Sequence, residues 1–204
     1  MSRHSSGAHR KLYRLMLRLS QTMAILGGIV LTGLIVLIVV SVAGRSLNTI
    51  LHLGFVENSF PQMAQSLLDW GIGPILGEYE VVETSMPFTI LAFMPLCLLT
   101  GGHASVDLFT QRLPQNLNRF IDLVVAVLFA VSFLLITWRL FDGMSGKMRY
   151  NESTTLMQIP VWKAYAAAFV SAVVTCVVAV YVALVRLVES VTGRVMLQTG
   201  GAEH

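Results

Sequence analysis

A histidine and an aspartate with helical spacing are the first residues of this sequence that could do chemistry. They lie in the stretch LLTGGHASVDLF, residues 98–109, where His103 precedes Asp107 by four positions. Side chains at i and i+4 on a helix are neighbours, so the two could bind a ligand together or transfer a proton. The same stretch could equally be a hydrophobic helix leaving a membrane, because an apolar run stops at Gly101 and Gly102.

Two carboxylates form a second candidate group. Glu80 and Glu83 are three residues apart in GEYEVVETSMPF, so they share one face of a helix. One interpretation is an ion pair of Glu83 with Arg45 or Arg139. The other is a solvated helix start, where the helix dipole favours negative charge.

The elements that hold these residues are hydrophobic helices. Of 204 residues, 55% are hydrophobic and 12% are charged, about half the charged fraction of a soluble domain. Long uncharged stretches are separated by short charged ones, and a spanning helix needs roughly 20 apolar residues. The sequence therefore predicts an all-α integral membrane protein, a single membrane domain over 1–204, with spans at about 20–44, 81–102, 117–139 and 162–186. We interpret the first span as a retained helix, because its apolar run is longer than the core of a cleaved signal peptide.

Basic residues in the short flanks predict the orientation, since cytoplasmic loops carry more lysine and arginine. One side holds nine such residues: Arg3, Arg10, Lys11, Arg14, Arg18, Arg112, Arg119, Arg186 and Arg194. The other side holds five: Arg45, Arg139, Lys147, Arg149 and Lys163. Both termini and the loop 103–116 are therefore expected in the cytoplasm, and the loops 45–80 and 140–161 in the periplasm.

Amphipathic segments are expected along both membrane surfaces. The leader 1–18 places Lys11, Arg14 and Arg18 at helical spacing, where they could contact lipid headgroups or act only as a topology signal. Apolar residues at i, i+3 and i+7 predict a short interfacial helix over 104–113, and residues 59–70 are expected to lie along the outer interface.

Two prolines fall in the predicted second span. Pro87 is expected in its first turn, where a missing N–H is tolerated. Pro95 is interior and is expected to kink the helix unless a neighbour satisfies the freed carbonyl group.

No residue pattern indicates catalysis or a cofactor. Cys97 and Cys176 lie in apolar runs, and no metal-ligand spacing is present. A haem anchor would need paired histidines inside the helices, but His103 lies at a span end and the other histidines lie outside the spans. The uncharged runs that mark these spans, 19–44, 84–106, 123–138 and 164–185, contain no aspartate, glutamate, lysine or arginine of the kind that carries protons or substrates in a transporter. We expect neither an enzyme nor a metal, cofactor or nucleic-acid partner.

Three motifs, taken in order, resemble one family. They are Glu83 in EVVETSMPF, the pair His103 and Asp107 in GGHASVDLFTQRLP, and Trp162 with Tyr165 in STTLMQIPVWKAY. The chain resembles the small membrane subunit, the DctQ type, of tripartite ATP-independent periplasmic (TRAP) transporters from Arg18 to Arg186.

The resemblance implies a heteromeric complex in the bacterial inner membrane. The small subunit would pack on the scaffold of a large membrane subunit and support sodium-driven uptake of an organic acid delivered by a periplasmic binding protein. Subunit-interface or structural roles are then expected for Arg45, Glu83, His103, Asp107, Trp162 and Tyr165. For His103 and Asp107 this role is favoured over proton coupling.

The alternative function is a membrane anchor of a respiratory or quinone-linked enzyme. A four-helix drug exporter fits less well, since none of the uncharged runs contains a carboxylate. Membrane helices associate through small residues, so Gly27–Gly28, Gly33 and Ala166–Ala168 are candidate contact strips.

Overall fold

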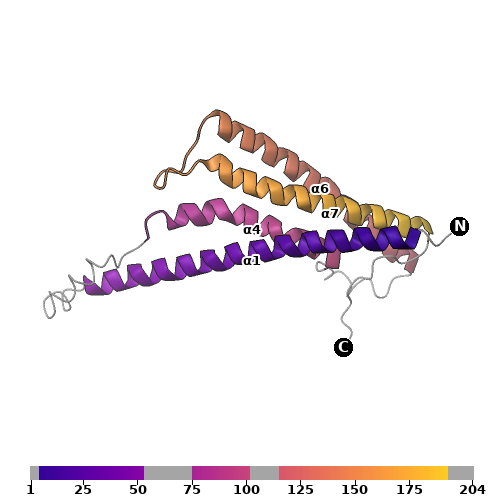
Figure 1. Cartoon of the computed structure of the whole chain (residues 1–204), viewed down its shortest axis with the longest axis horizontal. Coiled ribbons are helices and arrows are strands. Elements are labelled where there is room, and N and C mark those ends of the chain that lie inside the picture. The colour runs from indigo at the N-terminus through magenta and orange to yellow at the C-terminus, as the bar shows by residue number, and fades with distance from the viewer. Residues whose placement is uncertain (1–4, 53–74, 102–114, 193–204) are drawn as a thin grey trace.

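The computed structural model describes residues 5–52, 75–101 and 115–192, which form four long helices (Figure 1). The helices are α1 (Ser5–Leu51), α4 (Glu78–Thr100), α6 (Gln115–Arg149) and α7 (Val161–Thr192). Each contains an apolar stretch long enough to cross a membrane. This confirms the prediction of an all-α protein with four candidate spans.

The leader and the first span form one continuous helix. α1 runs from Ser5 to Leu51 without a break, because no proline or glycine interrupts the chain between Arg10 and Leu26. Lys11, Arg14 and Arg18 are exposed on its first turns. The leader is therefore a helix that feeds directly into the first span, while its position at the cytoplasmic surface and the contact of these side chains with headgroups stay predictions. The expected interfacial helices at 59–70 and 104–113 lie outside the described residues.

The four helices pack in the order α1, α4, α7, α6, with α7 as the central helix. Figure 1 shows that the pair α1 and α4 and the pair α6 and α7 converge where α1 begins and diverge where α1 ends. We call the divergent end, where α4 and α7 begin, the Glu80 end. The opposite end, where α7 finishes, is the Glu189 end. Buried side chains from all four helices, among them Met16, Leu98, Phe133 and Val178, form one apolar cluster.

α1 meets α4 along a seam of small residues. Ser20, Gly27, Leu34 and Ser41 are the buried positions of this stripe and lie seven residues apart, the spacing that keeps one helix face on its partner. At Gly27 an added Cβ would lie 2.8 Å from the Cβ of Ala92, whereas Gly28 and Gly33 face open space. Of the three glycines predicted to contact another helix, only Gly27 therefore does so among the described residues.

Hydroxyl groups join the other helix pairs. The Thr137 hydroxyl of α6 lies 3.2 Å from the Ala172 carbonyl oxygen of α7 and 2.7 Å from the Phe133 carbonyl oxygen of its own helix. The Thr175 hydroxyl of α7 lies 3.1 Å from the Leu91 carbonyl oxygen of α4 and 2.8 Å from the Ser171 carbonyl oxygen of its own helix. Pro95, four residues after Leu91, has no N–H to donate to that carbonyl group. The expected neighbour of the freed carbonyl is therefore Thr175, and such bonds hold membrane helices together.

Pro87 is also inside α4, contrary to the prediction that it occupies the first turn. The helix begins at Glu78, earlier than its apolar stretch, because the acidic residues Glu78 and Glu80 are helical too. Carboxylates in a first helical turn are favoured by the helix dipole.

A double-mutant cycle tests the bond between Thr175 and Leu91. We expect Thr175→Val to lower the free energy of unfolding in bilayer discs by about 1 kcal/mol. In a Pro95→Ala background the loss should be smaller, because the amide of residue 95 can then donate to Leu91. Thr100→Val is the control, since that hydroxyl bonds to Leu96 of its own helix. Equal losses of unfolding free energy in both backgrounds would contradict the inference that the Thr175 hydroxyl takes the place of the N–H that Pro95 lacks.

Candidate functional site

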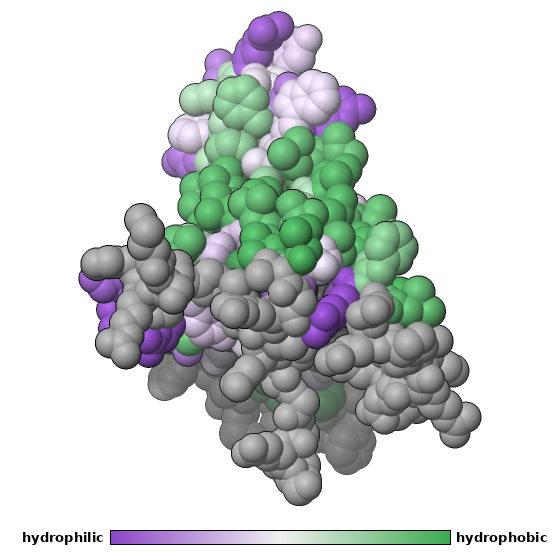
Figure 2. Space-filling view, turned by 90° about the vertical axis from the view of Figure 1, so that its right-hand side faces the viewer, coloured by the Kyte–Doolittle hydropathy of each residue, from purple (hydrophilic) through white to green (hydrophobic). Residues whose placement is uncertain are grey.

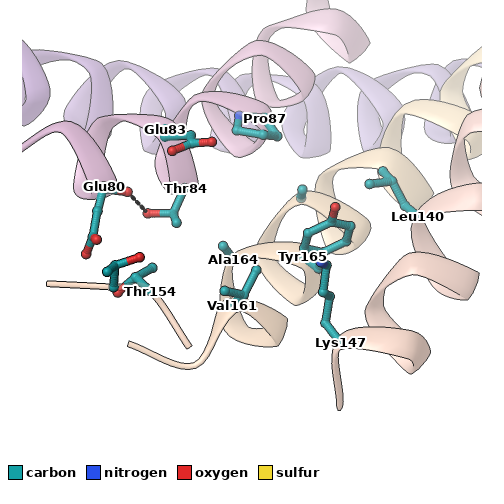
Figure 3. Close-up of a pocket in the computed structure, with 12 residues that line it drawn as sticks. Glu80, Glu83, Thr84, Pro87, Leu140, Lys147, Thr154, Val161, Ala164 and Tyr165 are labelled. Atoms are coloured by element: carbon teal, nitrogen blue, oxygen red, sulfur yellow. Dashed lines mark hydrogen bonds between the residues drawn. The ribbon is translucent and has the colours of Figure 1, made fainter. Parts of the chain in front are cut away.

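A cavity of about 500 Å³ lies at the Glu80 end, where the two helix pairs diverge (Figure 3). α4 contributes Glu80 and Glu83, α6 contributes Lys147, and α7 contributes Tyr165. The connection between α6 and α7 also lines it. Polar side chains from three helices and one loop thus surround a space at the end of an apolar bundle.

The connection from Tyr150 to Pro160 folds into a compact turn. Thr154 N–H donates to the Ile159 carbonyl oxygen at 2.9 Å, and Val161 N–H donates to the Glu152 carbonyl oxygen at 3.0 Å. Asn151 and Gln158 have positive φ angles of 48° and 54°, which let the chain reverse over this short distance. The bonds hold the loop in one conformation beside the cavity.

Glu80 ties this loop to α4. Its two carboxylate oxygens accept the N–H groups of Leu156 at 2.7 Å and of Met157 at 3.0 Å. Met157 also covers Gly77, which has a φ of +83° just before α4 begins. We call Gly77, Glu80, Leu156 and Met157 the loop clamp. It connects α4 to the α6–α7 pair where those helices diverge.

Arg45 pairs with a different carboxylate from the predicted one. Its guanidinium group forms an ion pair with Glu78, and in the described part of the chain Glu83 has no ion-pair partner. Five helical residues separate the two glutamates, a rotation of about 140° around α4. Glu78 consequently faces α1, while Glu83 faces the cavity. The predicted pairs of Glu83 with Arg45 or Arg139 are therefore wrong.

The remaining described candidates lie at the same end. Tyr165 is half-buried against α6, where an added Cβ at Gly143 would lie 2.8 Å from the ring. Trp162 is also half-buried on the first turn of α7. Lys147 forms an ion pair with Glu152 of the connection. His103 and Asp107 fall outside the described residues, so their role stays a prediction.

Charged side chains at the Glu189 end form a cluster that the sequence interpretation missed. Arg186 lies 3.0 Å from the Glu189 carboxylate and 3.5 Å from that of Asp122 on α6. Glu189 is only 4% exposed, so its charge needs this partner. The sequence did contain one indication of this cluster. Asp122 and Arg186 flank the third and fourth predicted spans on the same predicted side of the membrane.

Across the described residues, no group of three histidine, cysteine or acidic side chains is placed to hold a metal ion. The surface is instead strongly apolar. Ile29 of α1 is 64% exposed and Leu128 of α6 is 61% exposed. Figure 2, seen from the Glu189 end, shows hydrophobic residues covering the visible body beyond the grey segments, with hydrophilic residues at its far tip. Such a surface belongs in lipid or against other membrane helices.

Four apolar helices with polar clusters at both ends define a multi-pass membrane protein. Residues 34–190 match the family model of the tripartite ATP-independent periplasmic transporters, DctQ component. The chain therefore belongs to the DctQ family of small TRAP permease components and is not an enzyme. No curated protein and no solved structure gave a significant match.

Proposed function

We propose that this chain is the accessory subunit that packs on the scaffold of the large TRAP membrane subunit. In this role it supports sodium-driven uptake of an organic acid that a periplasmic binding protein delivers. The observation that carries the proposal is the DctQ match over residues 34–190. The spans support it, since 19–44, 84–106, 123–138 and 164–185 contain no aspartate, glutamate, lysine or arginine and substrate paths in membranes depend on polar groups.

The proposed orientation places the Glu80 end in the periplasm of a bacterial inner membrane and both termini in the cytoplasm. The excess of lysine and arginine on the side of the termini supports it. The cavity and the loop clamp then face the side from which a binding protein arrives. Arg45 and Tyr165 act structurally within the chain, while His103 and Asp107 are proposed contacts of the cytoplasmic side.

Co-purification tests this function. A tagged form of the chain, expressed with the large TRAP membrane subunit of the same organism, should retain that subunit after extraction in mild detergent. Proteoliposomes with both subunits and the binding protein should take up an organic acid only with an inward sodium gradient, and omission of this chain should abolish uptake. Purification instead with a haem absorbance band or a quinone-dependent enzyme would favour the anchor alternative and overturn the proposal.

A further inference from the structure

A lateral groove lies beside the cavity on the outside of the bundle. α4 and α6 both pack on α7 and leave between them an apolar groove of about 530 Å³. Val82, Met86 and Ile90 line it from α4, and Ile136 and Leu140 line it from α6. Since these side chains lie in the candidate spans, the groove faces the hydrocarbon region of a membrane.

The groove and the cavity are adjacent. Glu83, Pro87 and Leu140 line both of them. The apolar groove therefore adjoins a space with carboxylate, ammonium and hydroxyl groups. This order of surfaces matches an amphiphile with a polar head and a hydrocarbon tail.

The length of the groove matches a hydrocarbon chain. From Tyr79 to Leu91 it follows α4 for about 18 Å, close to the ~15 Å hydrocarbon depth of one leaflet.

Charge in the cavity indicates the head. Within the described residues the Glu83 carboxylate has no ion pair, and it stands at the junction of groove and cavity. Lys147 lies across the cavity beside the Tyr165 ring and is already paired with Glu152, so it does not compensate the charge of Glu83 (Figure 3).

We propose that the groove and cavity together bind a phospholipid whose headgroup carries a primary amine, such as phosphatidylethanolamine. One acyl chain lies along the α4–α6 groove, and the ammonium group of the head pairs with Glu83. The lipid fills the gap between helix pairs that the protein's own side chains leave open. This inference does not depend on the transported substrate.

Lipid retention on the intact complex tests the proposal. The complex of this chain with the large subunit is incubated with equal amounts of phosphatidylethanolamine and phosphatidylglycerol in detergent, and native mass spectrometry counts the bound lipids. We expect a preference for phosphatidylethanolamine of about fivefold, the ratio that one partly exposed ion pair supports. Glu83→Gln should remove the preference, and Leu140→Trp should reduce binding of both lipids by filling the groove.

Asp142→Asn is the matched control, because Asp142 is an exposed carboxylate of α6 that does not line the groove. It should leave lipid binding unchanged. Equal binding of the two lipids by the unaltered complex, or a preference that survives Glu83→Gln, would overturn the head assignment. A photo-crosslinker at Ile90 that labels the large subunit instead of lipid would overturn the groove assignment. Co-purification of the large subunit is scored separately, so a failed complex is distinguished from a failed lipid site.

Discussion

Gly27→Val is expected to lower the free energy of unfolding of this chain by about 3 kcal/mol, at the upper end for overpacking of a closely packed contact. A single Cβ at position 27 would already lie 2.8 Å from the Ala92 Cβ. Both atoms are attached directly to helix backbones, so no side-chain rotation relieves the clash. α1 and α4 must separate, and the seam of small residues along α1 loses its contacts.

Gly28→Val provides the control for this prediction. The two glycines are adjacent in the same helix, so the substitution changes helix propensity equally, but a Cβ at position 28 meets nothing within 4 Å. We expect its effect to stay within about 0.5 kcal/mol. Reversible unfolding of each variant in bilayer discs, followed by circular dichroism, gives the comparison. Equal stabilities of the two variants would show that α1 does not approach α4 at Gly27.

The spans were predictable because charge is expensive in hydrocarbon, so gaps between charged residues mark the membrane. The contact at Gly27 was only partly predictable. Small residues indicate where helices can approach, but Gly27, Gly28 and Gly33 are equally small. The three glycines differ in which face of α1 they occupy. Gly27 lies on the buried face, together with Ser20, Leu34 and Ser41 at seven-residue spacing, and the sequence alone does not show which face is buried.

The hydroxyl group that contacts the Leu91 carbonyl oxygen could not be predicted from the sequence, for a different reason. The sequence does show that the Leu91 carbonyl oxygen lacks its helical donor, because a proline at position 95 has no N–H to donate to the residue four positions earlier. Its donor, Thr175, comes from another helix 84 residues further along the chain. Several hydroxyl-bearing residues occur in the spans, and only the packing of α4 on α7 selects one of them.

The residue at which α4 begins decides which of its carboxylates face α1 and which face the cavity. The span predicted from its apolar residues begins near position 81, which makes Glu83 its deepest carboxylate and the expected partner of Arg45 or Arg139. The helix in fact begins at Glu78. This extra turn gives Arg45 a carboxylate on the α1 side and turns Glu80 and Glu83 toward the cavity. The bonds of Glu80 could not be predicted, since backbone N–H groups have no sequence signature.

Gly77→Ala is expected to weaken the loop clamp and to lower the free energy of unfolding by about 2 kcal/mol, mainly because an L-residue is disfavoured in the left-handed conformation. Gly77 has a φ of +83°, and an added Cβ would lie 2.5 Å from the Met157 Cγ. The methionine must move, and its backbone N–H is one of the two that Glu80 holds. Amide hydrogen exchange at Leu156 and Met157 should therefore accelerate more than exchange in the middle of α7.

A second substitution separates the two causes. In Gly77→Ala with Met157→Ala the clash is gone, so any loss measured against Met157→Ala alone reports the backbone conformation. We expect about 1–2 kcal/mol of the loss to remain. Gly146→Ala in α6, where an added Cβ meets nothing within 4 Å, should be neutral or stabilising because alanine favours a helix. If Gly77→Ala behaved like Gly146→Ala, the left-handed start of α4 and the loop that rests on it would both be wrong. A loss that vanished entirely in the double variant would assign the effect to Met157 alone. The loop would then be held to α4 by side-chain packing and the Glu80 bonds, without a constraint from the backbone of Gly77.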